Sequence, residues 1–228
     1  MTDDWSERLR QAAAHSPIEA HWWQRPVLAL DLSSGNSRLQ GFDPAQPAEF
    51  CDWIAAERAR DGAEWAHGGY GEERVVYRMS PLFGGDSEDA RSVHLGVDLW
   101  LPAGSPVFAV LPGAVHSIAD NARFGDYGPT VILEHPSDGR SFHTLYGHLA
   151  RRTLDHLRVG QSVEGGEQIA WLGTPDENLG WPPHLHFQII TEIGDHQGDY
   201  PGVCRPAERR QWLQRCPDPA CLIPGLRP

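Results

Sequence analysis

The segment His94-Leu95-Gly96-Val97-Asp98 carries the strongest signal for the fold and the site of this 228-residue chain. Successive side chains of a β-strand point to opposite faces of the sheet. If these five residues form a strand, the imidazole of His94 and the carboxylate of Asp98 share one face. Gly96 then leaves a gap between them. The segment therefore predicts two metal ligands held close together on a sheet.

Two later segments, Tyr146-Gly147-His148-Leu149 and His184-Leu185-His186, add three more imidazoles. The spacing of two places His184 and His186 on the same face of a strand, while Leu185 faces the core. Each segment alone would occur by chance in many proteins, and an isolated histidine is more often a packed core residue than a ligand. Together the segments predict a mononuclear metal site built on a sheet.

This set of residue types suits metal-assisted hydrolysis. Zinc hydrolases commonly use three protein ligands and keep a fourth position for water. One carboxylate and two neutral imidazoles leave a net positive centre, which lowers the pKa of the bound water towards neutrality. Two further imidazoles can serve as a general base and as a hydrogen-bond donor to developing oxyanion charge.

Composition excludes several other classes of function. Hydrophobic residues make up 40% and charged residues 22% of the chain, which indicates a globular protein. The net charge of -12 disfavours a nucleic-acid partner, and no apolar stretch reaches the ~20 residues of a membrane span. The chain contains no lysine, which excludes Schiff-base chemistry and lysine-tethered prosthetic groups. The four cysteines lack the spacing of a structural zinc site, so we expect reduced thiols.

The first residues are polar and acidic, with no basic region followed by an apolar run. A secretory signal has that pattern. We therefore expect a cytoplasmic protein, or alternatively an exported one whose leader is absent from this sequence.

The pattern along the chain predicts a mainly β protein. We expect an antiparallel sheet or sandwich core, an N-terminal α/β decoration and a short C-terminal helix. The predicted regions are an N-terminal accessory region (1–90), a domain that carries the expected metal site (91–200) and a C-terminal helix and tail (201–228). Within the accessory region we expect helices at 3–14 and 47–60, strands at 26–32 and 74–79, and a loop at 62–71. Short strands are expected at 93–101, 106–111, 113–119, 130–135, 141–149, 167–173 and 184–191.

The stretch from about Val93 to Ile190 resembles the lysostaphin/LytM-type zinc metallopeptidases, which have the duplicated hybrid motif fold. The family pattern of HxxxD, a YxHL-like segment and HxH is present in full. The residues between these motifs also resemble the family, for example at Pro102-Ala103-Gly104-Ser105-Pro106-Val107 and Gly160-Gln161-Ser162-Val163.

This resemblance implies one Zn²⁺ per chain, with His94, Asp98 and His186 as ligands and His148 and His184 as the catalytic pair. It also implies hydrolysis of short peptides of the bacterial cell wall or of other small, unhindered peptides. The chain departs from the family pattern in two places. Pro129 stands where Asn often follows the Tyr-Gly turn, and residues 176–183 form a longer, proline-rich run before HxH. Both flank the expected substrate groove, so they bear on the substrate more than on the metal.

A second resemblance concerns the flanks, at Leu28-Ala29-Leu30-Asp31-Leu32-Ser33 and from Asp199 onwards. They are similar to the borders of an intracellular peptidase-like module found in phosphotransferase–aminotransferase fusions. The chain could on this ground be a free-standing relative of that module.

Two other functions stay open at this level. One is a metal- or ligand-binding module of the same fold without hydrolytic activity, and the other is histidine phosphotransfer. The intact set of five motif residues favours the enzyme. Near the expected site, Trp181 is a candidate to line the cleft. Trp100 is discounted because Pro102 should end its strand. The sequence leaves the oligomeric state open.

Overall fold

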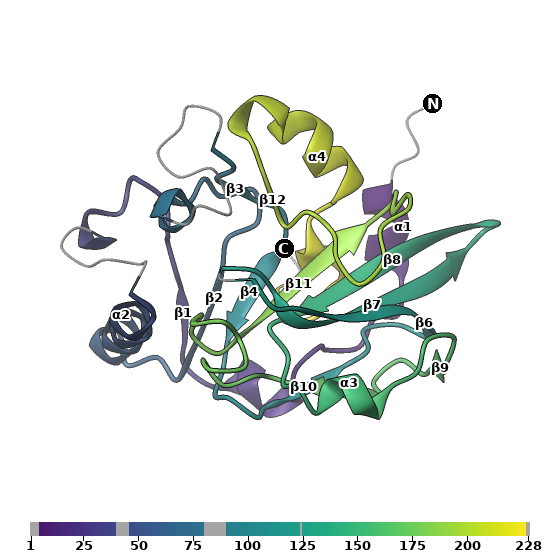
Figure 1. Cartoon of the computed structure of the whole chain (residues 1–228), viewed down its shortest axis with the longest axis horizontal. Coiled ribbons are helices and arrows are strands. Elements are labelled where there is room, and N and C mark those ends of the chain that lie inside the picture. Colours follow the sequence, from purple (N-terminus) through teal and green to yellow (C-terminus); the bar gives the residue numbers. More distant parts are fainter. Residues whose placement is uncertain (1–4, 40–45, 80–89, 124, 227–228) are drawn as a thin grey trace.

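The computed structural model describes residues 5–39, 46–79, 90–123 and 125–226. Its centre is an eight-stranded sheet in the order β1-β2-β4-β11-β8-β7-β6-β9 (Figure 1). β1 and β2 are parallel, and every other neighbouring pair in this sheet is antiparallel. The strands are β1 (Val27–Ala29), β2 (Trp65–Gly68), β4 (Val97–Trp100), β6 (Gly113–Asn121), β7 (Gly128–Ser137), β8 (Arg140–Gly147), β9 (Ser162–Val163) and β11 (His184–Ile190).

Two small sheets and several short helices complete the described fold. β3 (Val93–His94) pairs with β12 (Val203–Cys204), and β5 (Pro106–Phe108) pairs with β10 (Gln168–Trp171). The α-helices are α1 (Trp5–Gln11), α2 (Pro47–Arg60), α3 (Thr153–His156) and α4 (Arg209–Arg215). The 3₁₀ helices are η1 (Ala20–Gln24), η2 (Ser37–Leu39), η3 (Val75–Met79), η5 (Pro206–Glu208) and η6 (Pro219–Leu222).

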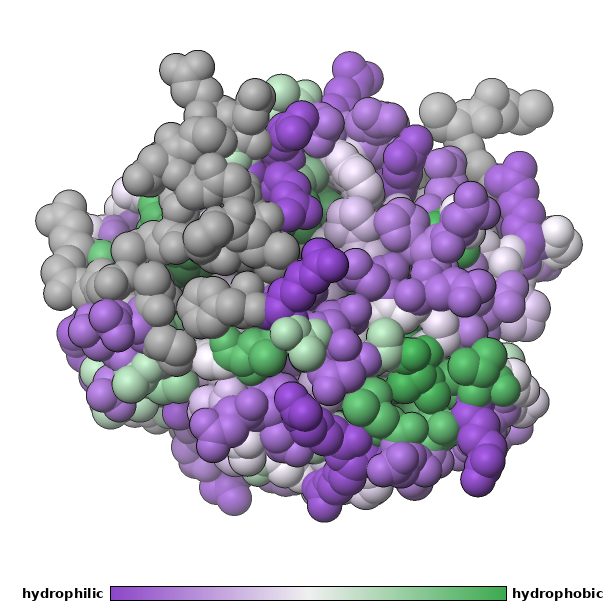
Figure 2. Space-filling view, in the orientation of Figure 1, coloured by the Kyte–Doolittle hydropathy of each residue, from purple (hydrophilic) through white to green (hydrophobic). Residues whose placement is uncertain are grey.

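The face of the molecule in Figure 2 is mainly polar. Hydrophilic residues cover most of it, and its largest apolar cluster lies towards the lower right. None of the helices within the described ranges is long and apolar enough to cross a membrane.

Alternate side chains of β11 point to the hydrophobic core on one face of the sheet and to the candidate site on the other. Leu185, Phe187 and Ile189 are fully buried and belong to the largest hydrophobic cluster. The alternate positions, His184, His186 and Gln188, point to the opposite face and are also buried. All seven residues of this strand are buried because protein covers both faces of the sheet at this point. The strand therefore presents its imidazoles to an enclosed space rather than to bulk water.

The register of the sheet places the first two segments of the motif against this strand. Asp98 of β4 lies directly opposite His186 of β11, and Gly147 of β8 lies opposite His186 on its other side. Directly opposed residues in an antiparallel pair have Cβ atoms only ~4.5–5.5 Å apart. Asp98 and His186 are therefore neighbours because of strand pairing, although they lie far apart in the sequence.

The predicted fold class is confirmed. The chain is mainly β, its central sheet is almost entirely antiparallel, and a short helix, α4, follows the last strand. The expected helix over residues 47–60 coincides with α2. The seven runs predicted as strands after residue 91 all contain strands.

Two local predictions in the first 90 residues are wrong. The expected strand over residues 74–79 is the 3₁₀ helix η3, in which the adjacent residues Val76 and Tyr77 are both buried. Strand-like pairing in this segment is limited to the single bridges at Glu73 and Arg74, which precede or adjoin this helix. The expected loop over residues 62–71 contains β2, which is short and ends at Gly68. β2 is stabilised by pairing with β1 and β4, which local sequence does not reveal.

The proposed boundary near residue 90 stays a prediction. β1 and β2 lie before it, and they extend the same sheet that carries β4 and β11. Trp65 of β2 is only 1% exposed and belongs to the same hydrophobic cluster as Leu185 and Phe187. This shared core leads us to expect that the two sides of the boundary unfold together.

Substitution of Trp65 tests this expectation. Trp65→Ala should destabilise the protein by about 3–5 kcal/mol, because it removes a buried aromatic side chain from the shared core. Urea unfolding should remain a single transition with a lower midpoint. The control is Val159→Ala, at a side chain 67% exposed, which should change stability by less than about 0.5 kcal/mol. Two transitions, of which one keeps the wild-type midpoint, would show that the accessory region is a separate unit.

Candidate functional site

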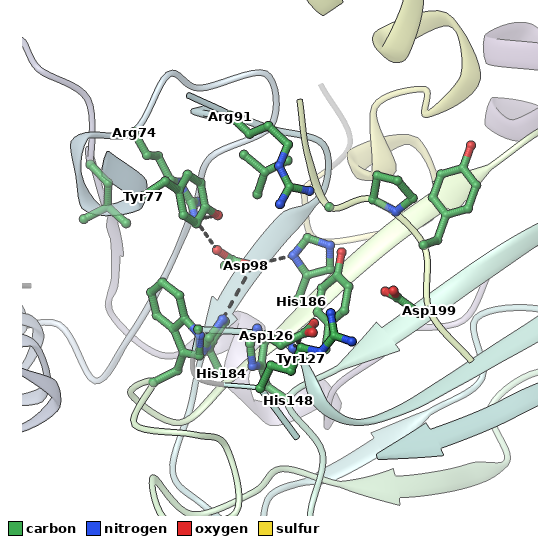
Figure 3. A pocket seen from close by; sticks show the side chains of 18 of the residues that line it. Arg74, Tyr77, Arg91, Asp98, Asp126, Tyr127, His148, His184, His186 and Asp199 are labelled. Carbon is green, nitrogen blue, oxygen red and sulfur yellow. Dashed lines mark hydrogen bonds and ion pairs between the residues drawn. The ribbon is translucent and has the colours of Figure 1, made fainter. Parts of the chain in front are cut away.

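All five side chains of the motif meet in one buried cluster. His94 ends β3, Asp98 lies in β4, His148 follows β8, and β11 supplies His184 and His186. These residues are between 1% and 6% exposed. Figure 3 shows the side chains of Asp98, His184, His186 and His148 converging on one another. The structure therefore brings together every residue that the sequence predicted for the site, while their individual roles stay predictions.

Three of these side chains have the dimensions of a metal site. His94 Nε2 lies 2.9 Å from His186 Nδ1. Asp98 Oδ1 lies 3.2 Å from the same His186 nitrogen and 3.4 Å from His94 Nε2. In a tetrahedral zinc site with bonds of about 2.0–2.1 Å, the ligand atoms are about 3.3 Å apart. The triangle formed by these three atoms could hold a metal ion of this kind.

Hydrogen bonds on the far side of each ring define which nitrogen carries the proton. His94 Nδ1 donates to the carbonyl of Gly69 over 2.9 Å, which leaves Nε2 without a proton. His186 Nε2 donates to Gln188 Oε1 over 3.0 Å, which leaves Nδ1 without one. The Gln188 amide is itself oriented, because its nitrogen donates to the Pro201 carbonyl and to Cys216 Sγ. These assignments follow from the hydrogen-bond network.

The donor set therefore fits a cation. Two nitrogen lone pairs and a carboxylate oxygen face one another within 3.4 Å in a buried space. Each of these atoms is an acceptor, so they repel one another unless a positive charge lies between them. The backbone and Gln188 hydrogen bonds are the outer contacts that metal-binding histidines need.

The other two histidines form a second pair beside the triangle. Their rings are 4.0 Å apart between centroids. His148 Nδ1 donates to Asn178 Oδ1 over 2.6 Å, and His184 Nδ1 donates to the Pro182 carbonyl over 2.6 Å. Asn178 is oriented by its own amide nitrogen, which donates to the carbonyls of Trp181 and Pro182. Both rings are therefore left with an unprotonated Nε2 that can accept a proton.

Burial keeps three of the imidazoles neutral. Desolvation, together with the charge of Arg74, lowers the pKa of His94 to about 3. Desolvation also lowers the pKa of His148 and of His184. Burial alone would raise the pKa of Asp98, but His94 and Arg74 bring it well below its usual value. At neutral pH these three imidazoles are thus neutral and Asp98 is a carboxylate, the protonation states that metal binding requires.

Arg74 is a site residue that the sequence did not reveal. Its Nη1 donates to Asp98 Oδ2 over 2.5 Å, and its Nε donates to Glu72 Oε2 over 2.8 Å. The side chains of Arg74 and Asp98 are each only 3% exposed. Burial by itself would lower the pKa of Arg74, but Tyr77, Asp98 and Glu72 raise it above its ordinary value. No spacing in the sequence connects Arg74 with the HxxxD segment, so only the structure places it here.

Tyr127 is the second side chain missing from the predicted site. Its ring lies 5.0 Å from that of His186 and 5.7 Å from that of His148. Among the described residues its hydroxyl, which is buried, has no hydrogen-bond partner. In the sequence, Tyr127 belongs to the Tyr-Gly turn before Pro129, and no pattern there distinguishes it from an aromatic residue of the hydrophobic core.

The pocket in front of these residues has a volume of about 220 Å³, room for roughly seven water molecules. Trp181 lines it, as expected, while the discounting of Trp100 is wrong. β4 extends to Trp100, whose ring stacks on His184 at 5.7 Å and 23°. Other apolar and aromatic lining residues are Leu32, Phe50, Tyr77, Tyr127, Tyr200 and Val203. Charged lining residues beside the motif are Arg91, Arg123, Asp126 and Asp199 (Figure 3).

The gap predicted at Gly96 is present. A Cβ atom at this position would lie 2.6 Å from His186 Cε1 and 2.7 Å from the carbonyl oxygen of Phe187. Real Cβ contacts are not that short, so the ring of His186 occupies space that any side chain at position 96 would need. The glycine in HxxxD is thus required by the third member of the triangle.

Comparison with known proteins identifies the domain that carries this site. Residues 92–198 match the model of peptidase family M23. The chain contains an M23 peptidase domain. The resemblance to lysostaphin/LytM-type enzymes is thereby confirmed. The match begins after Arg74 and ends before Pro201, so the M23 segment omits both outer partners described above.

Among the similar proteins, an uncharacterised metalloprotease of Haemophilus influenzae is 38% identical over 54% of this chain and 25% of its own length. The DD-carboxypeptidase/endopeptidase Mpg of Neisseria meningitidis is 33% identical over 71% of this chain and 36% of its own. The chain thus spans about a quarter to a third of these relatives. The catalytic domain of lysostaphin from Staphylococcus simulans matches with a TM-score of 0.42, at 22% identity over 69% of this chain and 94% of that one.

Replacement of Gly96 tests the packing of the M23 site. Gly96→Ala should weaken binding of a divalent metal ion by at least about 10-fold, because the new methyl group displaces the His186 ring, and such overpacking costs roughly 1–3 kcal/mol. Metal binding is measured by titration and stability by urea unfolding. Gly35→Ala is the matched control, because the nearest atom to its Cβ would be 3.5 Å away. Equal affinity in the two variants would contradict the assigned position of His186.

The neutral histidines predict a pH dependence of stability in metal-free protein. Unfolded histidine titrates near pH 6.5, while folded His94 has a pKa of about 3. The unfolded state therefore binds more protons between these values, and stability is lost as the pH falls below 6.5. With a chelator present, the loss between pH 7.5 and 5 should be about 2 kcal/mol smaller in His94→Asn than in wild type.

The measurement is the free energy of unfolding in urea at both pH values. His156→Asn changes an exposed histidine of α3 and should retain the wild-type dependence. If His94→Asn also retains it, the imidazole of His94 is not held neutral in the folded protein.

Proposed function

We propose that this M23 domain is a zinc-dependent metallopeptidase. The observation that carries the proposal is the buried triangle of His94 Nε2, Asp98 Oδ1 and His186 Nδ1, with edges of 2.9–3.4 Å and no proton on either nitrogen. The chemistry of two imidazoles and one carboxylate suits zinc. A solved zinc-containing peptidase from Vibrio cholerae, 30% identical over 48% of this chain, has a TM-score of 0.34.

These three residues would hold the ion, leaving a net charge of +1 on the ion and its ligands. When bound, zinc supplies a Lewis acid that polarises a peptide carbonyl and lowers the pKa of water towards 7. Burial of the ligands strengthens this effect, because charges interact more strongly where water is excluded.

His148 and His184 are assigned to proton transfer. Each presents an unprotonated Nε2, and Asn178 and the Pro182 carbonyl hold the two rings in place. Their centroids are 4.0 Å apart, so a proton on one ring disfavours a proton on the other. The pair therefore carries one proton at a time. It takes that proton from the attacking water and returns it to the leaving amine.

The Tyr127 hydroxyl can act as a hydrogen-bond donor, whereas the two histidines accept a proton. It is buried beside His148 and His186 and lacks a partner among the described residues. A neutral phenol is a hydrogen-bond donor. Burial raises its pKa well above the ordinary value, so it keeps its proton at neutral pH. We assign it to donation towards the negative charge that develops on the substrate carbonyl oxygen.

The proposed substrates are peptides with small residues around the scissile bond, in peptidoglycan or in a similar polymer. Support comes from the small pocket volume and from the names of relatives, which include peptidoglycan DD-endopeptidases of Vibrio cholerae. The pocket combines apolar lining residues, among them Trp100 and Trp181, with charged ones such as Arg91 and Asp199, so it can contact both apolar and charged groups of a peptide.

Two alanine variants separate metal binding from catalysis. His94→Ala should lose stoichiometric zinc, because it removes one of three ligands. His184→Ala should keep one equivalent of zinc and lose about 10²–10⁴-fold in turnover, because it removes a proton-transfer group. Zinc is measured by elemental analysis, and turnover by release of amines from cross-linked muropeptides and from tetraglycine.

His156→Ala, at an exposed position, is the control and should match wild type in both measurements. A full equivalent of tightly bound zinc in His94→Ala would disprove the ligand assignment. Stoichiometric zinc in wild type without hydrolysis of either substrate would instead favour the binding module without hydrolytic activity.

A further inference from the structure

We propose that Arg74 is a positioning residue that restricts Asp98 to a single ligating oxygen and so keeps one position on the metal open. This inference rests on the proposed zinc site. It assigns a role to the segment before the M23 match, because Arg74 lies 18 residues ahead of residue 92.

The two oxygens of Asp98 have separate partners. Oδ1 faces His186 Nδ1 at 3.2 Å and His94 Nε2 at 3.4 Å. Oδ2 accepts a hydrogen bond from Arg74 Nη1 over 2.5 Å. Figure 3 shows the Arg74 side chain reaching Asp98 from the side away from the histidines. A carboxylate whose second oxygen is bound in this way can offer only the first oxygen to a cation.

Arg74 is itself held on several sides. Its Nε donates to Glu72 Oε2, and Nη1 also donates to Tyr77 Oη over 3.1 Å. The guanidinium lies 5.7 Å from the ring centre of Tyr77 and 5.8 Å from that of Trp100. Its backbone is fixed as well, since Arg74 N donates to the carbonyl of Ser92. These contacts leave the side chain, which is 3% exposed, little freedom to release Oδ2.

The backbone around Gly69 leaves room for this arrangement. A Cβ atom at position 69 would lie 1.7 Å from Arg74 Nη2, and the φ angle there is +99°. The carbonyl of the same residue accepts the proton of His94 Nδ1. One short segment, residues 68–77, therefore supplies the outer contacts of two of the three proposed ligands.

The number of donor atoms makes the second oxygen important. Catalytic zinc sites have three protein donors and one position for water or substrate. If both oxygens of Asp98 bound the ion, the protein would supply four donors, and water would have to bind as a fifth ligand instead of completing a tetrahedral set. The residue at position 74 has to donate to Glu72 and to Asp98 at the same time. The planar guanidinium of arginine does this with two different nitrogens, whereas lysine offers a single nitrogen.

Cobalt substitution in the full chain tests the proposal without reliance on activity. Co²⁺ reports its coordination geometry through its visible absorption bands, which are intense for four ligands and weaker for more. The variants are Arg74→Met and Arg74→Lys. Arg38→Met is the matched control, because it removes an arginine–glutamate pair with Glu57 that takes no part in the metal site.

Wild type and Arg38→Met should bind one equivalent of Co²⁺ with the same intense bands. In Arg74→Met the bands should weaken by about two-fold or more, because the second Asp98 oxygen joins the ion. Arg74→Lys should change in the same direction. It retains the buried charge and so serves as the deciding variant if Arg74→Met does not fold.

Unchanged bands in an Arg74 variant with a lower urea midpoint would overturn the inference, because Arg74 would then only stabilise the fold. In that case the zinc site itself would stand. Absence of stoichiometric Co²⁺ from wild type would overturn the proposed function and this inference together.

Discussion

Three acceptor atoms forced together in a buried space are the constraint on which the rest of this structure depends. The nitrogens of His94 and His186 and an oxygen of Asp98 cannot satisfy one another. Their approach is maintained by strand pairing, which sets Asp98 opposite His186. The full burial of Leu185 and Phe187 on the other face of β11 stabilises that pairing. The hydrophobic core thus holds together a set of groups that electrostatics alone would separate.

The outer contacts of this set come from segments on both sides of the matched domain. His94 and Asp98 depend on Gly69 and Arg74, which precede it. His186 depends on Gln188, whose amide is oriented by Pro201 and Cys216 beyond it. The pairing of β3 with β12 brings the later segment next to the end of the HxxxD strand. The flanks are therefore part of the chemistry of the site, because they decide which atom of each ligand is free.

The sequence predicted the site residues whose spacing matches the two-residue repeat of a β-strand. A spacing of two in HxH and of four in HxxxD follows directly from strand geometry, and the glycine gap follows from the size of the His186 ring. Arg74 could not be found in this way. It lies just before the 3₁₀ helix that the pattern mistook for a strand, and its partner Asp98 is 24 residues away. Trp100 was missed for a related reason, since a nearby proline does not reveal where strand pairing ends.

The same limit applies to β2. Its residues Trp65–Gly68 show no alternation of apolar and polar side chains, and pairing with β1 and β4 makes them a strand. A strand that forms because it pairs with segments distant in the sequence has few features that can be recognised in its own residues. The long helix α2 is the opposite case, because Pro47 and the apolar positions that follow it mark its start within a single turn.

The hydrogen bond that the Gln188 amide donates to Cys216 Sγ has a practical consequence for the choice of domain boundaries. A fragment cut at the limits of the M23 match would retain all five motif residues and still lack the groups that orient His186 and Asp98. A fragment that keeps these contacts therefore has to extend from β2 through Cys216, and a chimera joined inside those limits would carry the five motif residues without the groups that orient them.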